Sequence, residues 1–371
     1  MKFALKQFFR LLFYSTLFWS FAFCLFIFIR YYGRNQEQVD AVKLSKTIAV
    51  SEYLMFGVIL GVMVAIVYTL IEFLFDKFLS KTFHLGFILL LKSVMYLLFL
   101  IFSLTFIAYL AEDYINVDFP NQRGWWISNR IFWLVITYFI ICSLLFSFIR
   151  LANDKFGKGV ILNMILGRYR EPREVERILM FLDLKASTTI AEKLGHLKYS
   201  QFIQDCFYYL NRIVSKYNAE IYQYVGDEAV LSWTFKRGVH QLNCLNLFFE
   251  YDAKLKMNSK YYLKKYGVVP EFKAGLHSGK IIIAEVGTVK KELAYHGDVI
   301  NTTSRIQEQC NEYNESLLLS EALLSNLKLG SRYRAIPLGD ELLEGKTEEL
   351  KLFAIHRTRF ETSELKGISK S

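Results

Sequence analysis

The sequence predicts two fold classes in one chain: an all-α transmembrane bundle of four spans, then an α/β domain with a ferredoxin-like βαββαβ core and C-terminal additions. Three observations predict this. The composition changes sharply near Leu151, from apolar and aromatic stretches to a mixed sequence. Four apolar runs before that point can cross a bilayer, for which about 20 residues suffice. After it, short apolar runs alternate with helical patterns, as in layered α/β domains.

The apolar runs place a transmembrane domain in residues 1–150. The first run is too long and aromatic for a cleaved signal peptide and lacks a cleavage site, so we interpret it as a retained helix. Lysines and arginines precede the first span, separate the second from the third and follow the fourth. Positive loops favour the cytoplasmic side, although the loop between the first two spans is also basic. We therefore expect a multi-pass protein of the inner (plasma) membrane with both termini in the cytoplasm. The predicted spans are residues 11–29, 53–75, 85–110 and 131–149.

Glu72 and Lys92 are the ionisable residues closest to the bilayer. Two interpretations stay open: both side chains extend toward the cytoplasmic face along their apolar stems, or they pair between the second and third helices. The bundle contacts membrane lipid, and it also offers a place for an unknown ligand or membrane partner. The sequence does not identify a stimulus.

Cysteine spacing and net charge exclude several other classes. The five cysteines have no CxxC spacing, and an odd number in a reducing compartment argues against disulfides and zinc. The net charge of +10 is partly explained by the positive loops beside the spans, so no nucleic-acid partner is expected.

Residues 151–176 form a juxtamembrane segment that we interpret as a transducing linker. Gly157, Gly159, Gly167 and Pro172 interrupt it, which excludes a long continuous coiled coil. Its apolar centre, 160–166, predicts a short amphipathic helix on the membrane or on a second copy of the chain; a passive tether is the alternative.

The C-terminal half, 177–357, contains the alternating elements, and 358–371 is expected to be a polar, frayed tail. The hydrophobic pattern first predicts a strand and a helix, then a hairpin and a second helix. Further strands, a helix containing Asn301 and a closing strand pair follow. The corresponding ranges are 177–184, 188–217, 219–225 with 229–235, and 239–266.

Two aspartates lie where predicted elements meet. Asp183 ends the first strand just before a helix, and Asp227 lies in the Gly-Asp turn of the hairpin. Separately, they could be an ordinary helix cap and an ordinary turn. If the strands are neighbours, the two carboxylates converge, which suits two divalent metals that hold a triphosphate. Ser187, Thr188 and nearby amides would then contact phosphate oxygens at the positive end of the helix.

A third polar pair strengthens the second interpretation. Asn301 and Arg305 are four residues apart, so on a helix they share one face. An amide and a guanidinium at this spacing can hold a ribose and a phosphate together, because arginine offers a planar fork of donors to phosphate oxygens.

Together these motifs resemble a class III nucleotide cyclase, the family of adenylate and guanylate cyclases, over residues 174–357. The resemblance implies that Asp183 and Asp227 bind two Mg²⁺ (or Mn²⁺) ions. It implies that Asn301 and Arg305 orient the ribose and stabilise the phosphate in the transition state. Lys346, in a Gly-Lys-Thr turn, would contact the triphosphate; a solvated turn lysine is the alternative.

The resemblance also implies a homodimer, in which the aspartates of one chain and the Asn301–Arg305 pair of the other form each site. Gln223 and Ala294 occupy the base-recognition positions, where they depart from both the adenine and the guanine patterns of the family. Glutamine can pair with adenine, and no carboxylate stands there to accept guanine protons. Small residues, Ala186 and Ser187, replace the usual Gly and Phe.

We therefore expect an adenylate cyclase that uses ATP. Three alternatives stay open: a guanylate cyclase, a diguanylate cyclase with a similar Gly-Asp-Glu turn, and a catalytically silent membrane receptor or partner subunit. The diguanylate cyclase would leave Asn301 and Arg305 unexplained. A silent domain usually lacks at least one of the four polar residues, and all four are present here.

Overall fold

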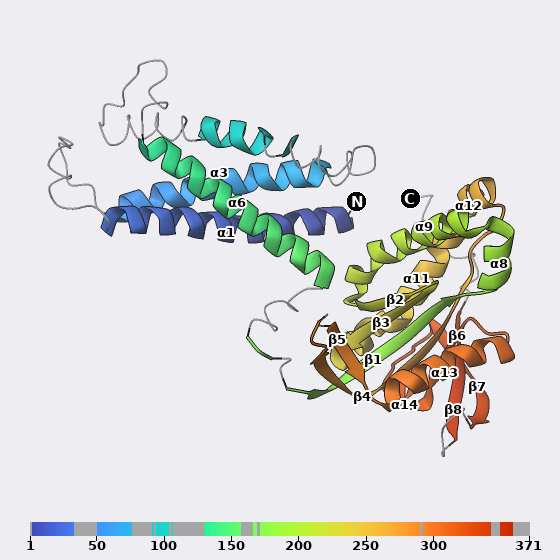
Figure 1. The fold of residues 1–371 in the computed structure, drawn as a ribbon. Helices are drawn as coiled ribbons and strands as arrows, with labels where there is room; N and C mark the ends of the chain where they lie inside the picture. The colour runs from blue at the N-terminus through green and yellow to red at the C-terminus, as the bar shows by residue number, and fades with distance from the viewer. Residues whose placement is uncertain are drawn as a thin grey trace, which may run out of the picture. The chain divides into compact units, whose positions relative to one another are not determined.

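The computed structural model describes residues 2–32, 50–75, 91–92, 94–103, 106, 130–156, 166–168, 171–289, 292–342 and 349–358. The chain divides into two compact units, Met1–Ala152 and Asn153–Ser371 (Figure 1). In the described residues, the first unit is helical and the second contains a mixed sheet with helices.

Three long helices form most of the described N-terminal unit: α1 (Lys2–Tyr32), α3 (Val50–Leu74) and α6 (Arg130–Phe156). Each contains a stretch long and apolar enough to cross a membrane, and these stretches overlap the predicted first, second and fourth spans. They are Phe8–Ile29, Leu54–Leu74 and Trp133–Arg150.

The predicted third span, 85–110, lies partly outside the described residues. A shorter apolar helix, Val94–Ser103, falls within it. The presence of apolar helices is thus established for the described part of the chain, and the count of four spans stays a prediction.

Helices α1 and α3 pack closely at two glycines of α3. A Cβ atom on Gly61 would lie 2.4 Å from the Cα of Ser20, and one on Gly57 would lie 2.7 Å from the Cδ1 of Ile27. Glycines four residues apart let helix backbones approach each other, a common arrangement in membrane bundles. The sequence contains this spacing, although our prediction did not use it.

Glu72 lies at the centre of a buried polar group that we call the Glu72 cluster. Lys92 Nζ lies 2.7 Å from Glu72 Oε2, and Arg150 forms an ion pair with the same oxygen. The hydroxyl of Tyr96 donates to Glu72 Oε1 at 2.8 Å. Of the two interpretations of Glu72 and Lys92, the structure therefore shows the pair, and it adds Arg150 from α6.

The C-terminal unit is built on an eight-stranded sheet. Seven strands follow the order β2-β3-β1-β4-β6-β8-β7, and the eighth, β5, lies off this path and pairs with β4. Strands β2, β3, β1 and β4 are neighbours in antiparallel pairs, which is the order expected of a βαββαβ core. The strands are β1 (Arg173–Leu184), β2 (Glu220–Val225), β3 (Glu228–Thr234), β4 (Phe272–Val286), β5 (Glu292–His296), β6 (Leu317–Ser320), β7 (Tyr333–Glu341) and β8 (Leu350–Arg357).

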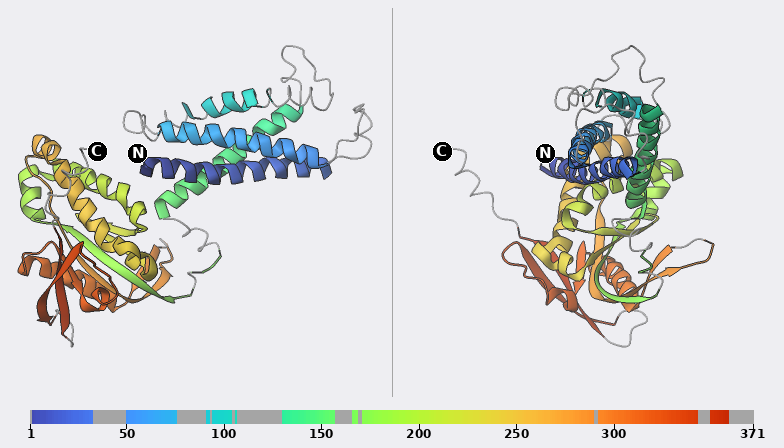
Figure 2. Two further views of the ribbon diagram at one scale, coloured as in Figure 1. Left: turned by 180° about the vertical axis from the view of Figure 1, so that it is seen from behind. Right: turned by 90° about the vertical axis from the view of Figure 1, so that its left-hand side faces the viewer.

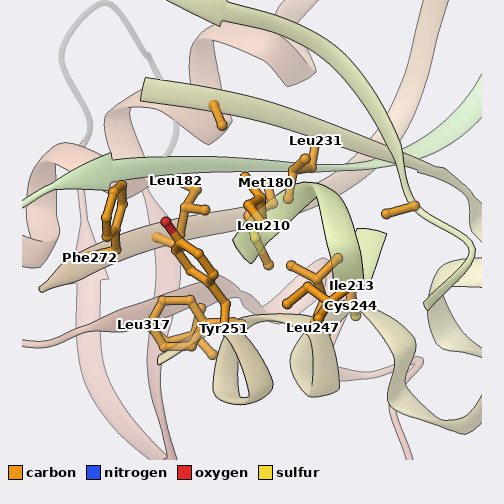
Figure 3. Packing of buried hydrophobic residues seen from close by; sticks show 14 of the residues in the cluster. Met180, Leu182, Leu210, Ile213, Leu231, Cys244, Leu247, Tyr251, Phe272 and Leu317 are labelled. Carbon is orange, nitrogen blue, oxygen red and sulfur yellow. The ribbon is translucent and has the colours of Figure 1, made fainter. Parts of the chain in front are cut away.

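Helices cover both faces of this sheet (Figure 2). On one face, alternate residues of β1 such as Met180 pack against α9 and α11, where Leu210 and Leu247 lie close to them (Figure 3). On the other face, Leu179 packs with Val299 of α13. The helices are α8 (Ser187–Leu194), α9 (His196–Val214), α10 (Phe235–Val239), α11 (Asn243–Met257), α12 (Ser259–Tyr266), α13 (Asp298–Glu312) and α14 (Glu321–Leu324).

Element boundaries differ from the prediction where tertiary pairing decides them. Strand β1 begins at Arg173, inside the predicted linker, because it pairs with β4 along its whole length. The predicted helix 188–217 is divided into α8 and α9 at Gly195, whose φ of 71° breaks the helix. The second predicted helix is interrupted by Gln241 and Leu242, which both adopt positive φ.

Candidate active site

Asp183 lies at the end of β1, on the face that α13 covers. Its cross-strand partner on β4 is Lys273, whose Nζ lies 3.3 Å from Asp183 Oδ2. The side-chain amide of Gln307, on α13, donates to the same oxygen at 3.2 Å. Both partners are buried, with 6% and 4% exposure. The sheet register and the adjoining helix thus hold this carboxylate in place.

Asp227 follows Gly226 in the tight turn between β2 and β3. The glycine has a φ of 61°, a conformation that favours glycine. Because Leu182 pairs with Ala229, the turn lies beside the end of β1, where Asp183 stands. The Oδ2 atom of Asp227 is buried and has no hydrogen-bond partner among the described residues. An orphaned buried carboxylate oxygen is costly unless something else binds it.

The electrostatics identify this place as a concentration of negative charge. Burial raises the pKa of Asp183 above its ordinary value; the ammonium of Lys273 opposes the rise, and the charge of Asp227 adds to it. Burial, followed by the charges of Asp183 and Asp227, raises the pKa of Glu228 to about 7. Three partly buried carboxyl groups therefore interact electrostatically, with Lys273 as a nearby cation.

This donor set suits a hard divalent cation. Mg²⁺ is commonly held by only one or two carboxylates together with substrate phosphates, and carboxylate oxygens are its preferred protein ligands. Among the described residues, no group of three or more His, Cys, Asp or Glu is arranged as a complete metal site. The orphaned Asp227 oxygen and the adjacent Asp183 fit a site that is completed by a phosphate-bearing substrate.

The first turn of α8 lies directly after Asp183. Ala186 precedes it with a φ of 54°, and no side chain caps the helix, so its first amides stay available. Ser187 is half-buried and Thr188 is exposed at this end. The nearby Tyr199 was not predicted: burial, then the charge of Asp227 and a side-chain hydrogen bond with that residue, raise its pKa to about 12.

Asn301 and Arg305 both lie on α13, as predicted, with Asn301 exposed. Arg305 pairs with Glu308 at 2.8 Å. At 100° per residue, Asn301 lies about 120° and Arg305 about 160° around the helix from Gln307. Within a single chain, Gln307 therefore contacts Asp183 while Asn301 and Arg305 lie on a different face of α13.

The two base-recognition candidates come from strands that are not neighbours in the sheet, since β2 pairs with β3 and β5 pairs with β4. Gln223 is exposed on β2, and Ala294 is half-buried on β5. Their neighbours Tyr222 and Tyr295 stack with ring centroids 4.0 Å apart, and the Tyr295 amide donates to the Tyr222 hydroxyl at 3.1 Å. This contact connects the two strands. Lys346 lies outside the described residues.

Sequence reasoning missed Lys273, Gln307 and Glu228 as neighbours of the aspartates. Glu228 follows Asp227 directly, and Gln307 is two residues after Arg305, so both stood beside recognised motifs. Lys273 gave no comparable signal, because only the β1–β4 register places it opposite Asp183.

Three features together define a nucleotide-cyclase type of domain: the mixed sheet, the paired aspartates, and the helix that carries Asn301 and Arg305. The family model described as adenylate and guanylate cyclase catalytic domain matches residues 171–357, about half of the chain. The chain therefore belongs to this family.

Two curated relatives and one solved structure show how far the similarity extends. Adenylate cyclase 2 of Rhizobium meliloti is 33% identical over 221 residues, which cover 60% of this chain and 61% of that protein. Adenylate cyclase 1 of the same organism is 25% identical over 207 residues, or 53% of this chain and 30% of that protein. The chain thus spans less than two thirds of either relative.

Among solved structures, a bacterial light-regulated adenylyl cyclase has the same fold. It is 18% identical, with a TM-score of 0.52 over 65% of this chain and 71% of that one. At this identity the likeness establishes the fold alone.

Proposed function

We propose that this chain is a membrane-bound adenylate cyclase that converts ATP to 3′,5′-cyclic AMP and pyrophosphate, with two Mg²⁺ (or Mn²⁺) ions at each site of a homodimer. One observation carries the proposal: two adjacent carboxylates, one with an orphaned buried oxygen, lie beside the uncapped start of α8. The adenylate cyclases among the relatives support the choice of reaction class.

In this mechanism Asp183 and Asp227 hold the metal ions, and Ser187, Thr188 and the first amides of α8 bind phosphate oxygens. Bound divalent metal would lower the pKa of the ribose 3′-hydroxyl and neutralise phosphate charge. The 3′-oxygen attacks the α-phosphorus in line, and the bond to the oxygen that bridges to the β-phosphate breaks. Pyrophosphate and a proton are released. Lys346 is assigned to the triphosphate.

Asn301 would orient the ribose, and the guanidinium of Arg305 would stabilise charge on the reacting phosphate. Asn301 and Arg305 lie on a different face of α13 from Gln307, which contacts Asp183, and this supports assembly of each site from two chains. Arg305 would exchange its contact with Glu308 for a phosphate of the nucleotide bound by its partner's aspartates.

Gln223 and Ala294 would read the base. A glutamine amide can donate to a ring nitrogen of adenine and accept from its exocyclic amine. The contact between Tyr222 and Tyr295, next to these two positions, supports a common recognition surface. We propose that ATP is the substrate for this reason.

The anchor that we propose has four spans and both termini in the cytoplasm, at the plasma membrane, where the nucleotide is available. Among the described residues, three apolar helices of spanning length and the shorter Val94–Ser103 support a membrane anchor. Regulation would reach the catalytic unit through the linker after α6. Membrane lipid, an unknown ligand or a membrane partner would act on the bundle.

The test is turnover by the purified full-length protein with Mg²⁺ or Mn²⁺, with ATP and GTP supplied separately and the products identified. Cyclic AMP from ATP alone supports the proposal. Cyclic GMP from GTP would overturn the base assignment while keeping the mechanism. A folded dimer that makes neither product would indicate a silent receptor or partner subunit instead.

A further inference from the structure

One oxygen of Asp183 is held from two directions. Lys273 Nζ lies 3.3 Å from Oδ2, and the Gln307 amide donates to the same atom at 3.2 Å. The lysine comes from β4 and the glutamine from α13, so two separate elements converge on this atom. Both side chains are buried, which makes their arrangement a fixed part of the interior.

The backbone fixes both partners. Asp183 and Lys273 are directly opposite in the β1–β4 register, which places their side chains on one face of the sheet. Helix α13 approaches β4 so closely at Gly275 that a Cβ atom there would lie 2.4 Å from the backbone nitrogen of Gln307. Gly275 thus allows α13 to lie close to β4, at the distance from which Gln307 reaches Asp183.

Lys273 is a cation that lies among several carboxyl groups. Asp183, Asp227 and Glu228 are three carboxyl groups that interact electrostatically, and Lys273 is the cation that acts on both Asp183 and Glu228. Several carboxylates packed without a cation would repel one another strongly in a partly buried site. A lysine in this position balances part of that charge in the metal-free protein.

We propose that Lys273 and Gln307 are positioning residues for the metal-binding carboxylate of Asp183, and that Lys273 also serves as a built-in counter-cation of the metal-free site. This inference rests on the proposed function, because it takes Asp183 as a metal ligand. Gln307 fixes the orientation of the carboxylate without adding charge. Lys273 stabilises the fold before metal binds, and it weakens the binding of a divalent cation by repulsion.

The two residues therefore have opposite expected effects on metal affinity. Removal of the ammonium by Lys273→Met should make Mn²⁺ bind about tenfold more tightly, because a positive charge no longer opposes the ion. The same variant should unfold at a lower temperature without metal and recover most of the difference when Mn²⁺ is added. Gln307→Leu should weaken Mn²⁺ binding about threefold, because the carboxylate loses a donor that orients it.

The experiment measures Mn²⁺ binding to the full-length protein without nucleotide, from the electron paramagnetic resonance signal of free Mn²⁺, together with thermal unfolding. Lys273→Arg should keep the wild-type affinity. Lys280→Met is the matched control, since Lys280 is an exposed lysine on the same strand that pairs with Glu174; its affinity should not change.

Weaker or unchanged Mn²⁺ binding in folded Lys273→Met would overturn the counter-cation role. Wild-type binding in Gln307→Leu would overturn the positioning role of the glutamine. If Lys273→Met does not fold, Lys273→Gln is measured instead, and it should also bind Mn²⁺ more tightly than the wild type. Asp183→Asn distinguishes failure of this inference from failure of the proposed function. If this variant still binds Mn²⁺ as the wild type does, the metal assignment of the proposed function fails, whatever the Lys273 variants show.

Discussion

At the scale of single residues, the candidate site depends on the buried oxygen of Asp227. Its neighbours Asp183 and Glu228 raise the cost of burying another negative charge there, and yet the oxygen has no hydrogen-bond donor among the described residues. Such an arrangement reduces stability unless a cation binds. The cost is consistent with a site selected for binding rather than for folding.

This cost leads to a prediction for Asp227→Asn. Under the proposed function, product formation should fall about a hundredfold or more, because the variant loses a negatively charged metal ligand, and weaker metal binding leaves less positive charge to stabilise the reacting phosphate. Thermal unfolding without metal should occur at an equal or higher temperature, since repulsion is relieved. Asp252→Asn, which removes a surface partner of Lys256, is the control and should change neither measurement.

At the scale of elements, α9 and α12 are joined through Asp205. Its carboxylate accepts hydrogen bonds from the hydroxyls of Tyr261 and Tyr266, each at 2.6 Å, and from Lys265 Nζ at 2.8 Å. Burial alone would raise the pKa of Asp205, but these three donors outweigh it and hold the pKa below the ordinary 3.8. A single charged group thus connects two helices on the same face of the sheet.

We expect Asp205→Asn to lower the free energy of unfolding by about 1–2 kcal/mol at pH 7, because charge-assisted hydrogen bonds are lost. A depressed folded-state pKa contributes stability above the unfolded value near 3.8, and this contribution disappears as pH falls through the lower folded value. Denaturation of wild type and variant at pH 7 and pH 3 checks this. The difference should shrink at pH 3, whereas Glu321→Gln, at an exposed pair, should have little effect at either pH.

The close contact between β4 and α13 leads to a second prediction at this scale. A methyl group on Gly275 would lie 2.4 Å from the nitrogen of Gln307 and 2.8 Å from the carbonyl oxygen of Thr303, and neither backbone atom can move cheaply. Gly275→Ala should cost about 3 kcal/mol and lower activity, because α13 carries Asn301 and Arg305. In contrast, Gly330→Ala meets open space at positive φ and should cost about 1 kcal/mol. Similar losses in the two variants would contradict this.

In the N-terminal unit, the Glu72 cluster likewise joins separate elements through one carboxylate. Glu72→Gln removes the carboxylate that Lys92, Arg150 and Tyr96 share. Breaking a buried ion pair from one side costs about 3–5 kcal/mol, so the full-length protein in detergent should unfold at a clearly lower temperature. Thr137→Val, at an exposed position of α6 where the hydroxyl bonds only within its helix, is the control. Unfolding at the wild-type temperature would show that the cluster is dispensable.

At the scale of the whole molecule, the proposed two-chain site leads to a prediction. Gln307 contacts Asp183, and Asn301 and Arg305 lie on a different face of α13, so we propose that one chain presents two half-sites. A twofold-symmetric pair of chains would complete both.

Co-expression of two inactive variants tests this arrangement. Chains carrying Asp227→Asn and chains carrying Arg305→Ala should together recover about one quarter of wild-type activity, because half the dimers are mixed and each mixed dimer keeps one intact site. Each variant alone should stay inactive. No recovery from a mixture that demonstrably contains mixed dimers would mean that each site lies within one chain.

Local patterns in the amino-acid sequence predicted the order of the elements and the candidate residues. The alternation of apolar runs predicted the strands, and the motifs around Asp183, Asp227, Asn301 and Arg305 identified the family, because such patterns are local in the chain. The family match and the mixed sheet confirm this coarse picture. The roles of these residues and the four-span count stay predictions.

Contacts between side chains that are distant in the sequence arise from the three-dimensional fold. Lys273 is 90 residues after Asp183 in the chain, and only the pairing of β1 with β4 places them opposite each other. Arg150 and Glu72 likewise meet only when α6 packs beside α3. Contacts of this kind depend on strand register and on how closely helices approach, which are set by packing across the whole unit. No local pattern in the sequence therefore predicts them.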